Sequence, residues 1–132
     1  MADLQYPIGR FAEDPDVSAE KRQRWIEEIA AAPRTLRAAV AGRTPDQLET
    51  AYRPGGWTVR QVVHHLADRH LHVYLRFRLA LTESEPIIKG YDAAAWAELL
   101  DARTAPVEKS LALLEALHQR WVLLLRSLTA SD

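Results

Sequence analysis

Apolar residues recur at spacings of three and four in three long stretches of the chain. This spacing places them on one face of a helix. In the first stretch Ser18 is a suitable N-cap, Gly42 is a plausible end, and Pro33 predicts a kink or split near Ala32. The apolar positions of this stretch are Trp25, Ile26, Ile29, Leu36 and Val40.

The other two long helices have equally regular apolar faces. Thr58-Val59-Arg60-Gln61 is a capping box, and the helix that it opens is predicted to run to about Thr82, before Pro86. Its apolar face holds Val59, Val62, Val63, Leu66, His70, Val73, Tyr74, Phe77 and Leu81. The last helix is predicted from about Pro106 to about Leu128. Its stripe is Val107, Leu111, Leu114, Leu117, His118, Trp121, Leu125 and Leu128.

Shorter signals fill the gaps between these helices. Thr44-Pro45-Asp46-Gln47 predicts a short helical turn, and Asp92 caps a short helix within residues 91–99. Residues 1–17 are expected to form an irregular arm that lies over the body. Nothing resembles a strand, so residues 1–132 are predicted to be one all-α, bundle-like domain. Three amphipathic helices can close a core alone, or they can leave an apolar groove open.

Composition excludes several functional classes. The chain has 132 residues, no cysteine and a formal net charge of −1. A thiolate metal site, a disulfide and a cysteine nucleophile are therefore excluded, and the charge argues against nucleic-acid binding. No apolar run approaches the roughly 20 residues of a membrane span, and no signal peptide is visible. We expect a soluble, cytoplasmic protein without membrane or nucleic-acid partners.

The densest candidate chemistry lies near the start of the second long helix. His65 is predicted on the flank of the apolar face, followed by Arg69, His72 and Arg76. His64 is predicted to point further outward, where it could pair with Asp68 four residues later. This pattern has two interpretations. It is either a solvated helix flank, or the border of a cleft in which His65 is a metal ligand or a catalytic residue.

His70 and His118 lie inside apolar stripes. A histidine in such a position is more often a hydrogen-bonded core residue than a ligand. A catalytic zinc-like site also needs about three converging ligands, so one histidine does not make a site.

Taken in order along the chain, these residues resemble the YfiT branch of the DinB-like four-helix-bundle superfamily. The resemblance covers nearly the whole sequence. It runs through Tyr6-Pro7-Ile8-Gly9, Trp25-Ile26, Tyr52-Arg53, the segment from Gly55 to Asp68, His70, Tyr74, Arg76-Phe77, Leu81-Thr82-Glu83, Tyr91-Asp92, Trp96, Ser110 to Leu114, Leu117-His118, Arg120-Trp121 and Leu124-Leu125-Arg126.

The resemblance implies a divalent-metal-dependent hydrolase, or a transferase that uses bacillithiol or another low-molecular-weight thiol on an electrophile. It assigns a nickel or zinc ligand to His65. Two further ligands would come from a His-x-x-x-His pair on a fourth long helix, which we expect to be absent from this chain. His64, Asp68, His118 and Arg60 are candidates for orienting the site or the substrate.

Two functional hypotheses follow. Either the chain descends from a metal enzyme and its own metal site is incomplete, or it is a non-catalytic helical module. Such a module would self-associate or bind a partner through the groove that a missing helix leaves. In both cases we expect a homodimer that covers exposed apolar surface.

Overall fold

The computed structural model describes residues 3–132, so the part of the predicted arm formed by Met1 and Ala2 lies outside it. Three long and three short helices make up the described chain, which contains no strand. The elements are α1 (Ala19–Val40), α2 (Pro45–Leu48), α3 (Val59–Thr82), α4 (Ala93–Ala97), α5 (Leu100–Thr104) and α6 (Val107–Ser127). The all-α, bundle-like fold is therefore confirmed. No helix within residues 3–132 is long and apolar enough to cross a membrane.

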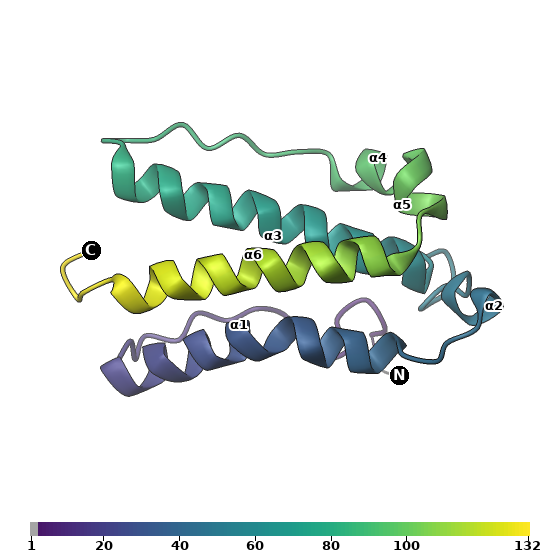
Figure 1. The fold of residues 1–132 in the computed structure, drawn as a ribbon, viewed down its shortest axis with the longest axis horizontal. Coiled ribbons are helices and arrows are strands. Elements are labelled where there is room, and N and C mark those ends of the chain that lie inside the picture. The colour runs from purple at the N-terminus through teal and green to yellow at the C-terminus, as the bar shows by residue number, and fades with distance from the viewer. Residues whose placement is uncertain (1–2) are drawn as a thin grey trace.

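The three long helices lie side by side, with α6 between α1 and α3 (Figure 1). The chain leaves the end of α3 and runs back along that helix to α4 and α5, which pack against α3 (Figure 1). Because α6 lies between the other two long helices, it contacts both α1 and α3. Its buried residues, which include Leu111, Leu114 and Trp121, therefore form much of the core.

The helix starts follow the capping residues that the sequence indicates. Thr44 and Thr58 each form a complete capping box, in which the threonine hydroxyl accepts from the third backbone N–H. The side-chain oxygen of the glutamine at that third position accepts a hydrogen bond from the threonine N–H. Ser18 and Asp92 cap α1 and α4 through their side-chain oxygens. These bonds satisfy backbone donors that a helix start leaves unpaired.

The core is built mainly from one side of α6. Leu114 and Leu111 are 2% and 3% exposed, and Trp121 is 5% exposed. Across the interface, Val63 and Ala67 of α3 are 1% exposed. Trp121 also packs with Tyr74 and Leu117 in one apolar cluster, to which Ile29 of α1 adds. The heptad-like stripe predicted for the last helix is thus the centre of the bundle.

A kink or a split was expected near Ala32, and the structure shows that Pro33 does not split α1. The helix runs unbroken from Ala19 to Val40 with Pro33 buried inside it. Proline has no N–H, so the carbonyl of Ile29, four residues earlier, loses its ordinary helical donor. His118 of α6 supplies a replacement, because its Nδ1–H donates to the Ile29 carbonyl over 2.6 Å. A tertiary hydrogen bond therefore compensates the local defect.

The same bond fixes the hydrogen positions of a histidine pair. A carbonyl can only accept, so His118 carries its proton on Nδ1 and presents Nε2 as an acceptor. His70 Nδ1–H donates to that Nε2 over 2.6 Å. The chain from the Ile29 carbonyl through His118 to His70 joins α1, α6 and α3. We call His70 and His118 the histidine pair.

Two other expectations need correction or refinement. No helix was predicted between residue 99 and the last long helix, but Leu100–Thr104 form α5, which packs against α3. The N-terminal arm is irregular, as predicted, but it buries little. Ile8 is 99% exposed and Phe11 is 91% exposed, so these side chains do not cover the body as an N-terminal strap would.

The inner face of α6 can be tested by two matched substitutions. Leu117 is 8% exposed and Leu123, on the same helix, is 70% exposed. Leu117→Ala is expected to lower the free energy of unfolding by about 2–5 kcal/mol, because it leaves a cavity in the core. Leu123→Ala should change it by less than about 0.5 kcal/mol. Urea denaturation of both variants measures the difference, and equal losses would contradict the packing.

The histidine pair makes stability depend on pH. Burial first, then His118, Arg69 and His65, lower the pKa of His70 to about 4, and burial also lowers that of His118. Because the folded pKa of His70 lies below its unfolded value near 6.5, the unfolded state binds more protons in between. The contribution of neutral His70 to the free energy of unfolding should therefore be fully present above about pH 6.5 and fall as the pH drops toward 4.

The variant His70→Gln tests this assignment. Glutamine can still donate to His118, but it does not titrate. Urea denaturation between pH 7 and pH 4.5 should show a shallower loss of stability in the variant than in the original chain. Identical pH profiles would show that the histidine pair is not the source of the pH dependence.

Candidate functional site

His65 lies on the second turn of α3, where the capping box of Thr58 fixes the start of the helix. Its ring is half-buried, and its centroid lies 4.8 Å from that of Trp57, which precedes the cap. The two rings are tilted by 53°. A bulky aromatic beside the imidazole restricts its rotation, so the side chain is held at the border of the apolar face, as the helical pattern predicts.

The surroundings of His65 favour its neutral form. Burial lowers its pKa, while Asp68 opposes this shift and Arg69 adds to it. The same burial raises the pKa of the Asp68 carboxyl, with Asp101 contributing in the same direction. A neutral imidazole is the form that binds a metal or accepts a proton. His65 is therefore chemically competent for either role near neutral pH.

His64 differs from its neighbour, and its predicted outward orientation is wrong. It is only 6% exposed, and it makes no pair with Asp68. Its Nε2–H donates to the Ala105 carbonyl over 2.8 Å. Its Nδ1 must then accept from the Ser110 hydroxyl at 2.6 Å. Both ring nitrogens are used, so His64 has no lone pair left for a metal.

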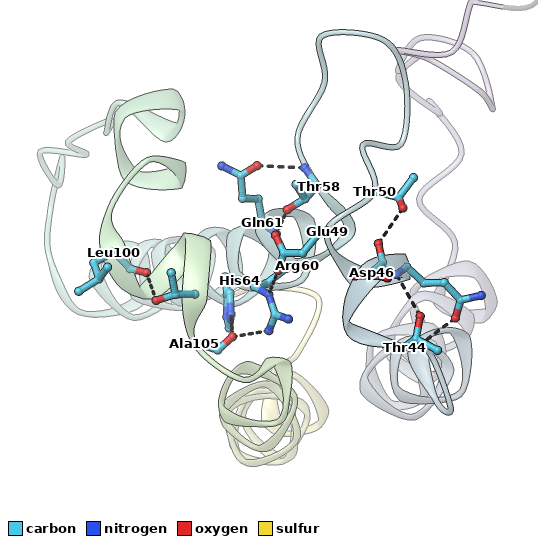
Figure 2. A network of polar contacts seen from close by, with 12 residues as sticks. Thr44, Asp46, Glu49, Thr50, Thr58, Arg60, Gln61, His64, Leu100 and Ala105 are labelled. Carbon is cyan, nitrogen blue, oxygen red and sulfur yellow. Dashed lines mark hydrogen bonds and ion pairs between the residues drawn. The ribbon is translucent and has the colours of Figure 1, made fainter.

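Arg60 reaches the same carbonyl from one turn earlier in α3. Its guanidinium donates to the Ala105 oxygen over 2.8 Å and to Glu49 over 2.5 Å. Figure 2 shows Arg60 and His64 converging on Ala105. We call Arg60, His64 and Ser110 the α3 brace, since they tie the start of α3 to the α5–α6 junction. Sequence spacing could not reveal this brace, because its acceptor is a backbone carbonyl distant in the chain.

The hydrogen bonds also sort the other histidines. His118 uses both nitrogens, one on the Ile29 carbonyl and one on His70. His72 donates from Nδ1 to the Asp68 carbonyl over 2.7 Å, which leaves its Nε2 as an acceptor. His70 likewise keeps one acceptor nitrogen. His118 was a candidate for orienting the site, but its contacts place it in the core between the long helices.

The donors near His65 do not complete a metal site. Within residues 3–132, no group of three or more His, Cys, Asp or Glu side chains is placed to hold a metal ion. His65 and Asp68 are three residues apart on one helix, and they supply at most two ligand residues. A catalytic zinc-type site takes about three protein ligands and an open position. The described residues alone therefore do not fit such a site.

One further cluster was not found from the sequence. The ring of His72 stacks on Tyr91 at a centroid distance of 4.0 Å, and Trp96 meets both rings edge-on or tilted. The residues come from α3, from the segment before α4, and from α4 itself. Only the return of the chain along α3 brings them together, so spacing within one helix gave no signal.

Comparison with known proteins places the chain among relatives of the same fold. YfiT of Bacillus subtilis, named as a proposed metal-dependent hydrolase, is 52% identical over 126 residues, covering 96% of this chain and 71% of the relative. A protein of Bacillus licheniformis with the same proposed activity is 49% identical over 132 residues, covering all of this chain and 75% of the relative.

A solved structure of Bacillus subtilis YfiT matches this chain with a TM-score of 0.94 and 52% identity. The match covers 97% of this chain and 73% of the solved one, which is described as a metal-dependent hydrolase candidate with an unusual four-helix bundle topology. A family model of the DinB superfamily matches residues 19–132. The resemblance seen in the sequence is thus confirmed, and the chain belongs to the DinB superfamily.

Proposed function

We propose that this chain is the scaffold of a metal-dependent hydrolase, in which His65 is a metal ligand. The observation that carries the proposal is the division between two adjacent histidines. His64 is buried and commits both nitrogens to the α3 brace, whereas His65 is half-buried and lies beside Asp68. The names of the YfiT-type relatives, which describe metal-dependent hydrolases, support the same reaction class.

The residues of this chain would position His65 as a metal ligand, but they would not complete the metal site. The α3 brace holds the first turns of the helix against the α5–α6 junction, and Trp57 limits the rotation of His65. Asp68 is the nearest carboxylate on the same helix, and we propose that it orients His65 or contributes a second donor. Because residues 3–132 of one chain bring no three donors together, we propose that the further ligands come from another segment or from a second copy.

Several finer features belong to the same proposal. Nickel or zinc is the ion that the family resemblance implies, and neutral imidazole is a suitable ligand for both. We propose a homodimer in the cytoplasm, acting on a small-molecule electrophile. Transfer to a low-molecular-weight thiol in place of water is the variant of this reaction that the family resemblance implies. An assay that offers an activated ester with and without a thiol would separate hydrolysis from thiol transfer.

An observation also favours the non-catalytic alternative. An apolar cleft of about 710 Å³ opens between α1, α3 and the end of α6. Its walls include Trp25, Phe77, Leu81 and Leu125. Such a cleft is suited to an apolar side chain or helix from a partner. If His65 has no affinity for metal, this cleft becomes the better guide to function.

Metal binding at His65 can be followed with Ni²⁺, whose paramagnetism broadens nearby NMR signals. Substoichiometric Ni²⁺ should broaden the His65 ring and the Asp68 side-chain signals first. His64 and His118 lack an open nitrogen, so their rings should not bind Ni²⁺ directly. The variant His65→Ala should lose this broadening, as measured by two-dimensional spectra of histidine ring nitrogens.

His72→Gln is the matched control. His72 lies on the same flank of α3 and keeps one acceptor nitrogen, so it would attract Ni²⁺ if any open imidazole sufficed. Unchanged broadening in His72→Gln together with its loss in His65→Ala supports the proposal. Broadening centred on His72 or His70, or no effect of His65→Ala, would refute the assignment of His65 and favour the non-catalytic module.

A further inference from the structure

A second cavity lies on the outer side of α3, away from the core between the long helices. It has a volume of about 470 Å³ and is enclosed by α3, the returning segment before α4, and Trp96. This volume lies within the range of small-molecule sites in proteins. Leu75, Leu79 and Ile88 give it an apolar wall. We call it the flank cleft.

The flank cleft has an ordered aromatic side. The ring of His72 stacks on Tyr91 with an interplanar angle of 14°, and the Tyr91 and Trp96 centroids are 4.7 Å apart. The three side chains come from separate stretches of the chain, and each lines the cleft. Such a cluster offers a flat surface against which a planar or aliphatic group can pack.

Two polar atoms at this cleft have no protein partner. The Nε atom of Arg76 and the hydroxyl of Tyr91 are buried, and neither finds a hydrogen-bond partner within residues 3–132. Buried polar groups are nearly always paired, so each such group calls for an explanation. Both residues line the flank cleft. Both atoms can donate a hydrogen bond, and a small shift of the two side chains would bring these donors to a ligand acceptor in the cleft.

The charges around the cleft specify the sign of that ligand. Arg76 and Lys89 are the cationic residues of its lining, and Asp92 is the acidic one. The Asp92 carboxylate accepts from the Ala95 N–H at the start of α4, and with two cations against this one anion the lining keeps a positive charge. Burial raises the pKa of Tyr91, so its hydroxyl keeps its proton as a donor. A guanidinium and a phenol that both donate favour an anionic oxygen.

From this arrangement we infer that the flank cleft binds a small organic anion, whose carboxylate or phosphate group accepts from Arg76 and Tyr91 and whose apolar body packs against Trp96. The inference goes beyond the proposed metal function and does not require a metal. His72 follows His65 by seven residues, about 10 Å along the helix axis. A ligand in the cleft therefore lies on the same flank of α3 as His65.

The test uses three probes with the same ring: benzoate, phenyl phosphate and neutral benzyl alcohol. Binding is measured by NMR titration of the Trp96 indole N–H and the Arg76 Nε–H. At least one anion should bind saturably, with a Kd of about 1 mM as expected for so small a ligand. Benzyl alcohol should bind at least about tenfold more weakly, since it lacks the charge. The stronger anion identifies the head group.

Two variants locate the anion contacts. Arg76→Gln should weaken anion binding by about tenfold or more. Tyr91→Phe keeps the ring that stacks on His72, and it should weaken binding severalfold through loss of the hydroxyl alone. Arg34→Gln, at an exposed position of α1, is the charge-matched control and should leave binding unchanged. Thermal unfolding of each variant checks that the fold is kept.

Three results would overturn the inference. The first is the absence of saturable shifts at Trp96 and Arg76 with either anion. The second is binding that survives both Arg76→Gln and Tyr91→Phe. The third is equal affinity for benzyl alcohol, which would mean that the cleft selects only for apolar bulk.

Discussion

The packing of the bundle depends on the Ile29 carbonyl of α1, which has no hydrogen-bond donor within its own helix. Pro33 removes the N–H that would bond the Ile29 carbonyl, and an unpaired carbonyl at a helix interface is costly. His118 supplies the donor, and this choice fixes its tautomer. It also turns the other nitrogen of His118 toward His70. The absent N–H of Pro33 in α1 thus leads to hydrogen bonds that connect α1 to α6 and α6 to α3. These bonds explain why two histidines lie inside otherwise apolar stripes.

Hydrogen bonds also distinguish the histidines that have only a structural role from those that could bind a metal. His64 and His118 each give one N–H to a backbone carbonyl and accept one hydrogen bond on the other nitrogen. They are satisfied core residues in spite of their chemical versatility. His65 stands apart because its ring lies beside Trp57 and its pKa is affected by the charges of Asp68 and Arg69. Adjacent residues of a helix point about 100° apart, so His64 can be a buried structural residue while His65 lies at the edge of the core.

Local patterns predicted the fold well, and the reason is physical. The capping boxes at Thr44 and Thr58 and the Asp92 cap are formed by residues within one turn, so their hydrogen bonds can be inferred from spacing. The apolar stripe of α6 was equally readable, because periodicity and burial coincide there. What failed depended on distant partners. The outward orientation of His64 was wrong because Ser110 and the Ala105 carbonyl, more than 40 residues away, draw it inward. Pro33 did not split its helix because His118 compensates the lost bond.

The polar flank of α3 indicates a binding site more clearly than either the exposed surface or the core does. His65, Asp68, His72 and Arg76 follow one another along this flank, and all are partly buried. On a free helix they would be solvated and would need no partner. Here Tyr91 of the returning segment and Trp96 of α4 pack against His72, and α4 and α5 contact α3. A buried polar group on this flank therefore needs a hydrogen-bond partner. His72 is met by the Asp68 carbonyl and by Tyr91, whereas Arg76 Nε and the Tyr91 hydroxyl are not met by protein. The charges alone would not make this flank a binding surface. Partial burial does, because it leaves the Arg76 Nε and the Tyr91 hydroxyl as donors that a ligand can pair with.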